Sequence, residues 1–220
     1  MYRSLEEFQI DARACGPDCY MDDSLQPEKL AAAYRIYEQA SGGTKLKDLD
    51  DHQVDFGVTI VGRLALRDDN GAWIPSDTAF PSIDEIMQEN LKTMGESPSD
   101  LGSILSAKNW SILANDAWLL GGIHAETEFH FASPLRWKNL WAPSAGRMTV
   151  TAREAICILS CGYEIIRPNP KLEAVAICTD AAKANRASLL TLNAALREYT
   201  GSEGLTNFYS SIPDAAKQYP

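Results

Sequence analysis

The sequence of 220 residues contains no run of about 20 apolar residues, the length that a helix needs to cross a bilayer. Its first residues, 1–8, are acidic and lack the apolar core of a secretory signal peptide. Cysteine is sparse and odd in number, at 5 residues, which does not suit a disulfide framework. These absences predict a soluble, reduced, cytoplasmic protein, and export without a cleaved signal stays open as the alternative.

Basic residues are in the minority, with 20 Lys and Arg against 30 Asp and Glu, so the formal net charge is −10. A charge of this sign opposes binding to the phosphate backbone of nucleic acids and to anionic membranes. An acidic chain can still bind a basic protein or a cation. We therefore expect a protein partner, no nucleic acid and no membrane.

The glycine-rich motifs of common nucleotide-binding enzymes are absent, both the phosphate-binding loop and the dinucleotide fingerprint. The Gly-x-Ser-x-Gly turn of many serine hydrolases is absent too. We therefore find no motif for a nucleotide cofactor. Enzymes whose active-site residues are dispersed along the chain are not excluded by these absences.

Helical and strand patterns alternate along the chain, which predicts a single α+β domain over residues 1–220. We expect a mainly antiparallel sheet of about five to six strands with helices packed on it. A subdivision near Ser97 is the alternative organisation. The predicted helices are 27–40, 82–94, 152–161 and 180–199, and the predicted strands are 54–66, 110–120, 121–131, 163–166 and 172–178.

Residues 121–131 show an alternation that organises the functional hypotheses. Every even position from 124 to 130 is ionisable, and the odd positions from 123 to 131 are mostly apolar. Because successive side chains of a strand point to opposite faces, this pattern predicts one strand with a core face and a polar face. The polar face would present His124, Glu126, Glu128 and His130 in a row, after a bend at the two preceding glycines.

This row suggests a catalytic or metal site. Neighbouring side chains on one strand face lie about 6.5–7 Å apart, so some of them could share an ion with ligands from elsewhere. We consider all four residues as catalytic, and His124, Glu126 and His130 as ligands of a divalent metal. The competing interpretation, which the missing zinc or iron spacing favours, is a surface ladder of paired charges or a partner-binding face.

Glu126 and Glu128, together with Arg63 on an earlier predicted strand, resemble the site pattern of ADP-ribosyltransferases. In that family an arginine holds the dinucleotide and the last glutamate stabilises the developing oxocarbenium ion. The resemblance would give these roles to Arg63 and Glu128. The Ser-Thr-Ser strand of that family is absent, and the separation between arginine and glutamate is compressed.

Cys19, which precedes His124 in the chain, has the order of the nucleophile and base in papain-like peptidases. The acidic residues Asp22 and Asp23 follow it closely, and negative charge raises a thiol pKa. A nucleophilic cysteine needs a lowered pKa. Cys15 and Cys19 are therefore better interpreted as a buried pair or as loop thiols.

A basic and aromatic segment follows the row, and it contains Arg136, Trp137, Lys138, Trp141 and Arg147. Tryptophan and arginine dominate binding hot spots because they combine a large contact area with a polar group. We predict a binding surface formed by four of these residues, namely Arg136, Trp137, Trp141 and Arg147. The alternative is that the tryptophans pack beneath the loop as a small additional core.

Binding is favoured over catalysis, because no motif combines a nucleophile, a base and an orienting group. We therefore expect a protein-binding module of an acidic, soluble, bacterial-type protein. Toxin-neutralising proteins and secretion-associated adaptors are its analogies. The alternative is an enzyme, a hydrolase or an ADP-ribosyl-type transferase, that uses the residues at 124–130.

Overall fold

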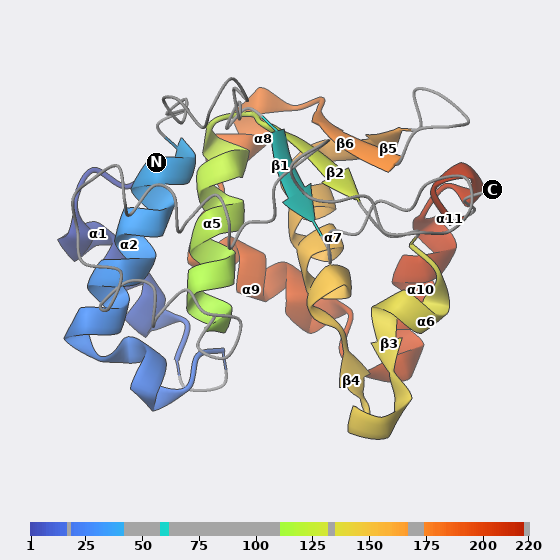
Figure 1. The fold of residues 1–220 in the computed structure, drawn as a ribbon, viewed down its shortest axis with the longest axis horizontal. Coiled ribbons are helices and arrows are strands. Elements are labelled where there is room, and N and C mark those ends of the chain that lie inside the picture. Colours follow the sequence, from blue (N-terminus) through green and yellow to red (C-terminus); the bar gives the residue numbers. More distant parts are fainter. Residues whose placement is uncertain (17–18, 42–57, 62–110, 132–134, 167–173, 218–220) are drawn as a thin grey trace, which may run out of the picture.

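The computed structural model describes residues 1–16, 19–41, 58–61, 111–131, 135–166 and 174–217 (Figure 1). It confirms the predicted α+β class, since helices pack on a mainly antiparallel sheet. The helices are α1 (Leu5–Ala14), α2 (Pro27–Ser41), α5 (Ile112–His124), α6 (Trp137–Leu140), α7 (Val150–Ser160), α8 (Ala181–Ala184), α9 (Leu189–Glu198), α10 (Gly201–Ser211) and α11 (Asp214–Lys217). The strands are β1 (Val58–Val61), β2 (Glu128–Phe131), β3 (Trp141–Ala142), β4 (Arg147–Met148), β5 (Tyr163–Ile166) and β6 (Ala174–Cys178).

The main sheet has the strand order β1-β2-β6-β5 in the part of the chain that the structure describes. β1 runs parallel to β2, whereas β2 and β5 both run antiparallel to β6. Phe129 and Phe131 of β2 are fully buried, as the alternation of this strand predicts. Figure 1 shows the sheet above α7, with α1, α2 and α5 on one side and α6, α10 and α11 on the other.

α5 is a helix that is buried on all sides, since every residue from 113 to 124 is buried. The Ser111 hydroxyl caps its start by accepting a hydrogen bond from the backbone N–H of Ala114. The predicted strands at 110–120 and 121–131 are therefore wrong over residues 112–124. A helix buried on all sides lacks the polar stripe that gives an amphipathic helix its period, so its sequence resembles a buried strand.

Gly121 marks the place where α5 touches α2. A methyl group at this position would lie 2.5 Å from the Ala40 Cβ and 2.7 Å from the Tyr37 carbonyl oxygen. Real side chains do not approach one another this closely, so only glycine permits this spacing of the two helices. The two glycines at 121–122 are therefore part of a helix, and the predicted bend between two strands is wrong.

Two predicted helices, 27–40 and 152–161, are confirmed as α2 and α7. α7 begins at Val150, because the hydroxyl of Thr149 caps it by accepting from the Ala152 N–H. The predicted helix at 180–199 is wrong as one element, since residues 185–188 separate α8 from α9. The strands at 163–166 and 172–178 are confirmed as β5 and β6, and the helix at 82–94 lies outside the described residues.

Both ends of the chain carry helices that the sequence analysis missed. The side chain of Ser4 caps α1 by accepting a hydrogen bond from the Glu7 N–H. This Ser-x-x-Glu pattern is a known helix-start signal. At the other end, Leu205, Phe208 and Ile212 are buried along one face of the segment that contains α10.

Candidate functional site

The row of ionisable residues at 124–130 does not lie on one strand. His124 is the last residue of α5, and Glu126 lies in the turn that follows, with a backbone φ of 55°. Only Glu128 and His130 belong to β2. The predicted His-Glu-Glu-His face is therefore wrong, because the chain changes from helix to strand in the middle of the row.

His124 is buried, with both ring nitrogens engaged. Its Nε2 lies 2.9 Å from the carbonyl oxygen of Ala187, which can only accept, and its Nδ1 lies 2.9 Å from the hydroxyl of Tyr37. Burial lowers the pKa of the imidazole to about 4, which outweighs the opposing effect of the Ala187 hydrogen bond. His124 is thus a neutral link between α2, α5 and the segment before α9.

Stability should fall between pH 6.5 and pH 4 because of His124. Its pKa is about 4 in the folded protein and about 6.5 in the unfolded chain, so the unfolded chain binds the proton more strongly in this window. We expect a loss of about 2 kcal/mol on going from pH 7 to pH 4.5 that is absent from His124→Gln. Urea unfolding of both proteins at both pH values measures this difference. The same pH dependence in both proteins would contradict the assignment.

The metal hypothesis for His124, Glu126 and His130 does not gain support from the arrangement. His124 has no lone pair directed at an open site, because one nitrogen donates to a carbonyl and the other accepts from a hydroxyl. Glu126 is exposed and accepts a hydrogen bond from Asn185 at 3.3 Å. Among the residues that the structure describes, no three His, Cys, Asp or Glu side chains gather closely enough to hold an ion.

The five cysteines are all free. Burial raises the pKa of the Cys15 thiol to about 12, with the charge of Asp11 acting in the same direction. Cys19 is partly exposed, with its Sγ 3.5 Å from the guanidinium of Arg197. His124 uses both nitrogens elsewhere, so it is not available as the base of a Cys19 nucleophile.

A closed ring of hydrogen bonds joins α5, α7 and α9 inside the molecule. The guanidinium of Arg153 binds both carboxylate oxygens of Asp116, at 2.9 Å from Nε and 2.5 Å from Nη2. Nη2 also donates to the Asn193 amide oxygen at 3.0 Å. The Asn193 amide donates to the Tyr20 hydroxyl at 2.9 Å, and that hydroxyl donates to Asp116 at 2.7 Å.

This polar ring is a structural cross-link. Asp116 is fully buried, and the Arg153 side chain is 15% exposed. Burial opposes the charge of Arg153, but the carboxylate of Asp116 more than compensates and raises the pKa of the guanidinium above its ordinary value.

The basic, aromatic segment forms α6 and the β3–β4 hairpin. The rings of Trp137 and Trp141 stack with their centroids 6.2 Å apart. Tyr209 of α10 meets Trp137 edge to face at 5.9 Å. Such offset and edge-to-face pairs are favourable aromatic geometries. The segment is therefore packed against a helix from the far end of the chain.

α11 is fixed beside these rings by contacts to its C-terminal carbonyls. The backbone N–H of Leu135 donates to the carbonyl of Ala216, and Nε of Arg136 donates to that of Lys217, both at 3.2 Å. The last four carbonyls of a helix have no partner within the helix, and these two bonds satisfy two of them. They hold Lys217 next to the tryptophan segment.

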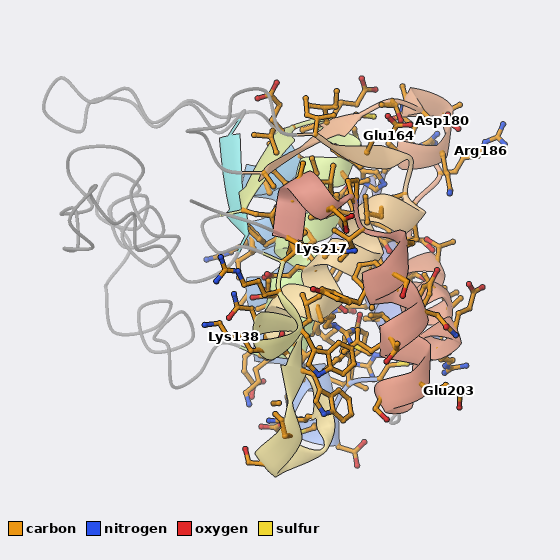
Figure 2. The ribbon with its side chains drawn as sticks, turned by 90° about the vertical axis from the view of Figure 1, so that its right-hand side faces the viewer. Lys138, Glu164, Asp180, Arg186, Glu203 and Lys217 are labelled. Carbon is orange, nitrogen blue, oxygen red and sulfur yellow. The ribbon has the colours of Figure 1, made fainter. Side chains whose placement is uncertain are left out.

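These elements surround an open pocket of ≈ 680 Å³, which we name the Trp/Arg pocket. It is lined by Arg136, Trp137, Lys138, Tyr209, Asp214 and Lys217. Nζ of Lys217 lies 4.7 Å from the centroid of the Tyr209 ring and 3.1 Å from a carboxylate oxygen of Asp214. In Figure 2, Lys138 and Lys217 lie on the face toward the viewer, and Arg186 lies apart from them at its upper right.

The charge of the pocket is opposite to that of the chain. Three cations and one carboxylate on its wall sum to +2, whereas the whole chain carries −10. A basic site on an acidic protein concentrates anionic groups at one place on the surface. The pocket therefore combines positive charge with aromatic walls.

Two of the four predicted binding residues, Arg136 and Trp137, line the pocket. Trp141 stacks against Trp137, while Arg147 lies on β4 opposite Ala142 in the hairpin. The C-terminal helices contribute three further lining residues that were not predicted, Tyr209, Asp214 and Lys217. The apolar spacing of residues 205, 208 and 212 could have predicted α10, because it follows one helix face.

No family model, curated protein or solved structure matches the chain. Within the described residues, no helix has both the length and the apolar character needed to cross a membrane. Any function therefore has to be argued from the chemistry of the site itself.

Proposed function

We propose that this chain is a protein-binding module that docks its partner through the Trp/Arg pocket. The observation that carries the proposal is a pocket of charge +2, walled by Trp137 and Tyr209, on a chain of charge −10. Aromatic and arginine side chains dominate the binding energy of protein interfaces. By analogy, the partner could belong to a toxin-neutralisation or secretion system.

The fixed position of the pocket walls supports binding. Trp137 contacts the rings of Trp141 and Tyr209, and Arg136 is held by its bond to the Lys217 carbonyl. Side chains that are ordered before binding lose little entropy when a partner docks. Such a surface gains affinity without a change of fold.

The free state of all five cysteines supports a reducing compartment as the place of action. Disulfides form and persist in oxidising compartments and are rare in the cytosol. We therefore propose that binding takes place in the cytoplasm.

The proposal is tested by placing a photo-cross-linking residue at position 138, on the pocket wall. Position 186 is the matched control, because Lys138 and Arg186 are both exposed cations and lie well apart (Figure 2). We expect a partner that cross-links at 138 and not at 186. The purified partner is then titrated against the unmodified chain and two charge-reversal variants.

Lys138→Glu should weaken the affinity for the purified partner at least about tenfold, because a charge of the wrong sign then faces the docked segment. Arg186→Glu changes the net charge equally, so any long-range effect is the same in both variants. The affinity of Arg186→Glu for the partner should stay within about twofold of that of the unmodified chain. Equal losses in the two variants, or cross-linking at 186 alone, would contradict the proposed function.

A further inference from the structure

We infer that the Trp/Arg pocket takes an acidic peptide segment in which carboxylates flank an aromatic or large apolar side chain. The inference rests on the proposed function and names the chemistry of the docked segment. It is carried by the composition of the wall, which places three cations beside two aromatic rings.

The three cations of the wall are the reason to expect carboxylates in the ligand. The three cations of the wall outnumber its one carboxylate; Lys138 is exposed, and Lys217 is paired with Asp214 at 3.1 Å. A carboxylate that enters the pocket meets this excess positive charge at close range. Charge-assisted hydrogen bonds to lysine and arginine are stronger than those between neutral groups.

The two aromatic rings of the wall are the reason to expect an apolar residue in the ligand. Trp137 and Tyr209 meet at an interplanar angle of 73°, so their two ring planes bound a corner of the pocket. A planar or branched side chain placed in such a corner covers both rings and removes apolar area from water. Both rings belong to half-buried residues, and carboxylates alone would leave their exposed parts in contact with water.

The wall favours a peptide over a phosphate or a nucleotide. The Asp214 side chain is 88% exposed, so a ligand can donate a hydrogen bond to its carboxylate, and a phosphate dianion carries no donor. A peptide has backbone N–H groups, which can donate hydrogen bonds to this carboxylate. α6 and α11, the helices beside the pocket, have four residues each, which is too short for a strong dipole at a phosphate. The net charge of −10 opposes a nucleic acid.

The probe is a fluorescein-labelled peptide with several glutamates around one phenylalanine, titrated against the full chain by fluorescence anisotropy. We expect saturable binding that weakens with added salt. Replacing the glutamates with lysines, or the phenylalanine with glycine, should weaken binding at least about tenfold. In the chain, Lys138→Glu should weaken binding by a similar factor, whereas Arg186→Glu should leave it unchanged.

Three results would overturn this inference. The first is equal affinity for the glutamate and lysine peptides, and the second is equal loss in Lys138→Glu and Arg186→Glu. The third is displacement of the peptide by inorganic phosphate or AMP at concentrations equal to that of the peptide. If the peptide fails to bind while a partner still cross-links at position 138, the ligand class is wrong and the proposed function stands.

Discussion

Asp116→Asn will lower the free energy of unfolding by about 3–5 kcal/mol, because it leaves the buried guanidinium of Arg153 without its counter-charge. The substituted amide keeps the shape of the carboxylate, so no cavity contributes to the loss. Of the two hydrogen bonds between Arg153 and the carboxylate, at most one can remain, because the amide nitrogen of asparagine cannot accept from the guanidinium. The loss is a large share of the total stability of an ordinary domain.

Urea unfolding measures this loss, and a double-mutant cycle with Arg153→Met isolates the ion pair. Because each single variant leaves one buried charge unpaired, the double variant should lose less than the sum of the two single variants. Asp214→Asn is the matched control, since Asp214 is also paired with a cation but is 88% exposed. The control should change stability by less than about 1 kcal/mol. A change equally small in Asp116→Asn would contradict the cross-link.

Gly121→Ala should destabilise the protein by about 3 kcal/mol, at the upper end of the usual cost of overpacking. Alanine is the better helix former by about 1 kcal/mol, so a helix without close neighbours would be stabilised by the change. Here the added methyl group meets the Ala40 Cβ at 2.5 Å and the Tyr37 carbonyl oxygen at 2.7 Å. The second contact is with backbone, so α2 as a whole has to move.

Ile112→Ala is the control for Gly121→Ala, because it lies on the exposed start of the same helix. It should shift the free energy of unfolding by about 0.5 kcal/mol or less in thermal or urea unfolding. A Gly121→Ala protein as stable as the unaltered chain would show that α2 and α5 do not need this close contact.

The fold class could be predicted from the sequence, because helix caps and strand alternation are local signals. α2 begins at Pro27, α7 begins near a Thr-x-x-Glu pattern, and β5 and β6 flank the Pro-rich segment 167–170, so all four were found. α5 has none, because burial on all sides removes the contrast between polar and apolar faces. The ionisable residues at 124–130 then suggested a strand, although the first of them ends a helix.

The site likewise contains residues that are neighbours in the sequence and residues that only the fold brings together. Arg136 and Trp137 are neighbours in sequence, so their composition alone pointed to a binding surface. Lys217 reaches the pocket only because α11 docks on the segment around residue 135, a pairing of distant residues. The pairing of Asp116 with Arg153 likewise joins residues 37 positions apart.

The use of the Trp/Arg pocket for docking is tested most directly by the indole N–H signals of the tryptophans in a ¹H–¹⁵N correlation spectrum. Trp137→Phe assigns the signal of Trp137, and Trp118 serves as the internal reference because it is 7% exposed and packs on Phe129. Saturation with the glutamate–phenylalanine peptide should shift the signal of Trp137 and leave that of Trp118 in place. Binding that leaves the Trp137 signal unmoved would contradict the account.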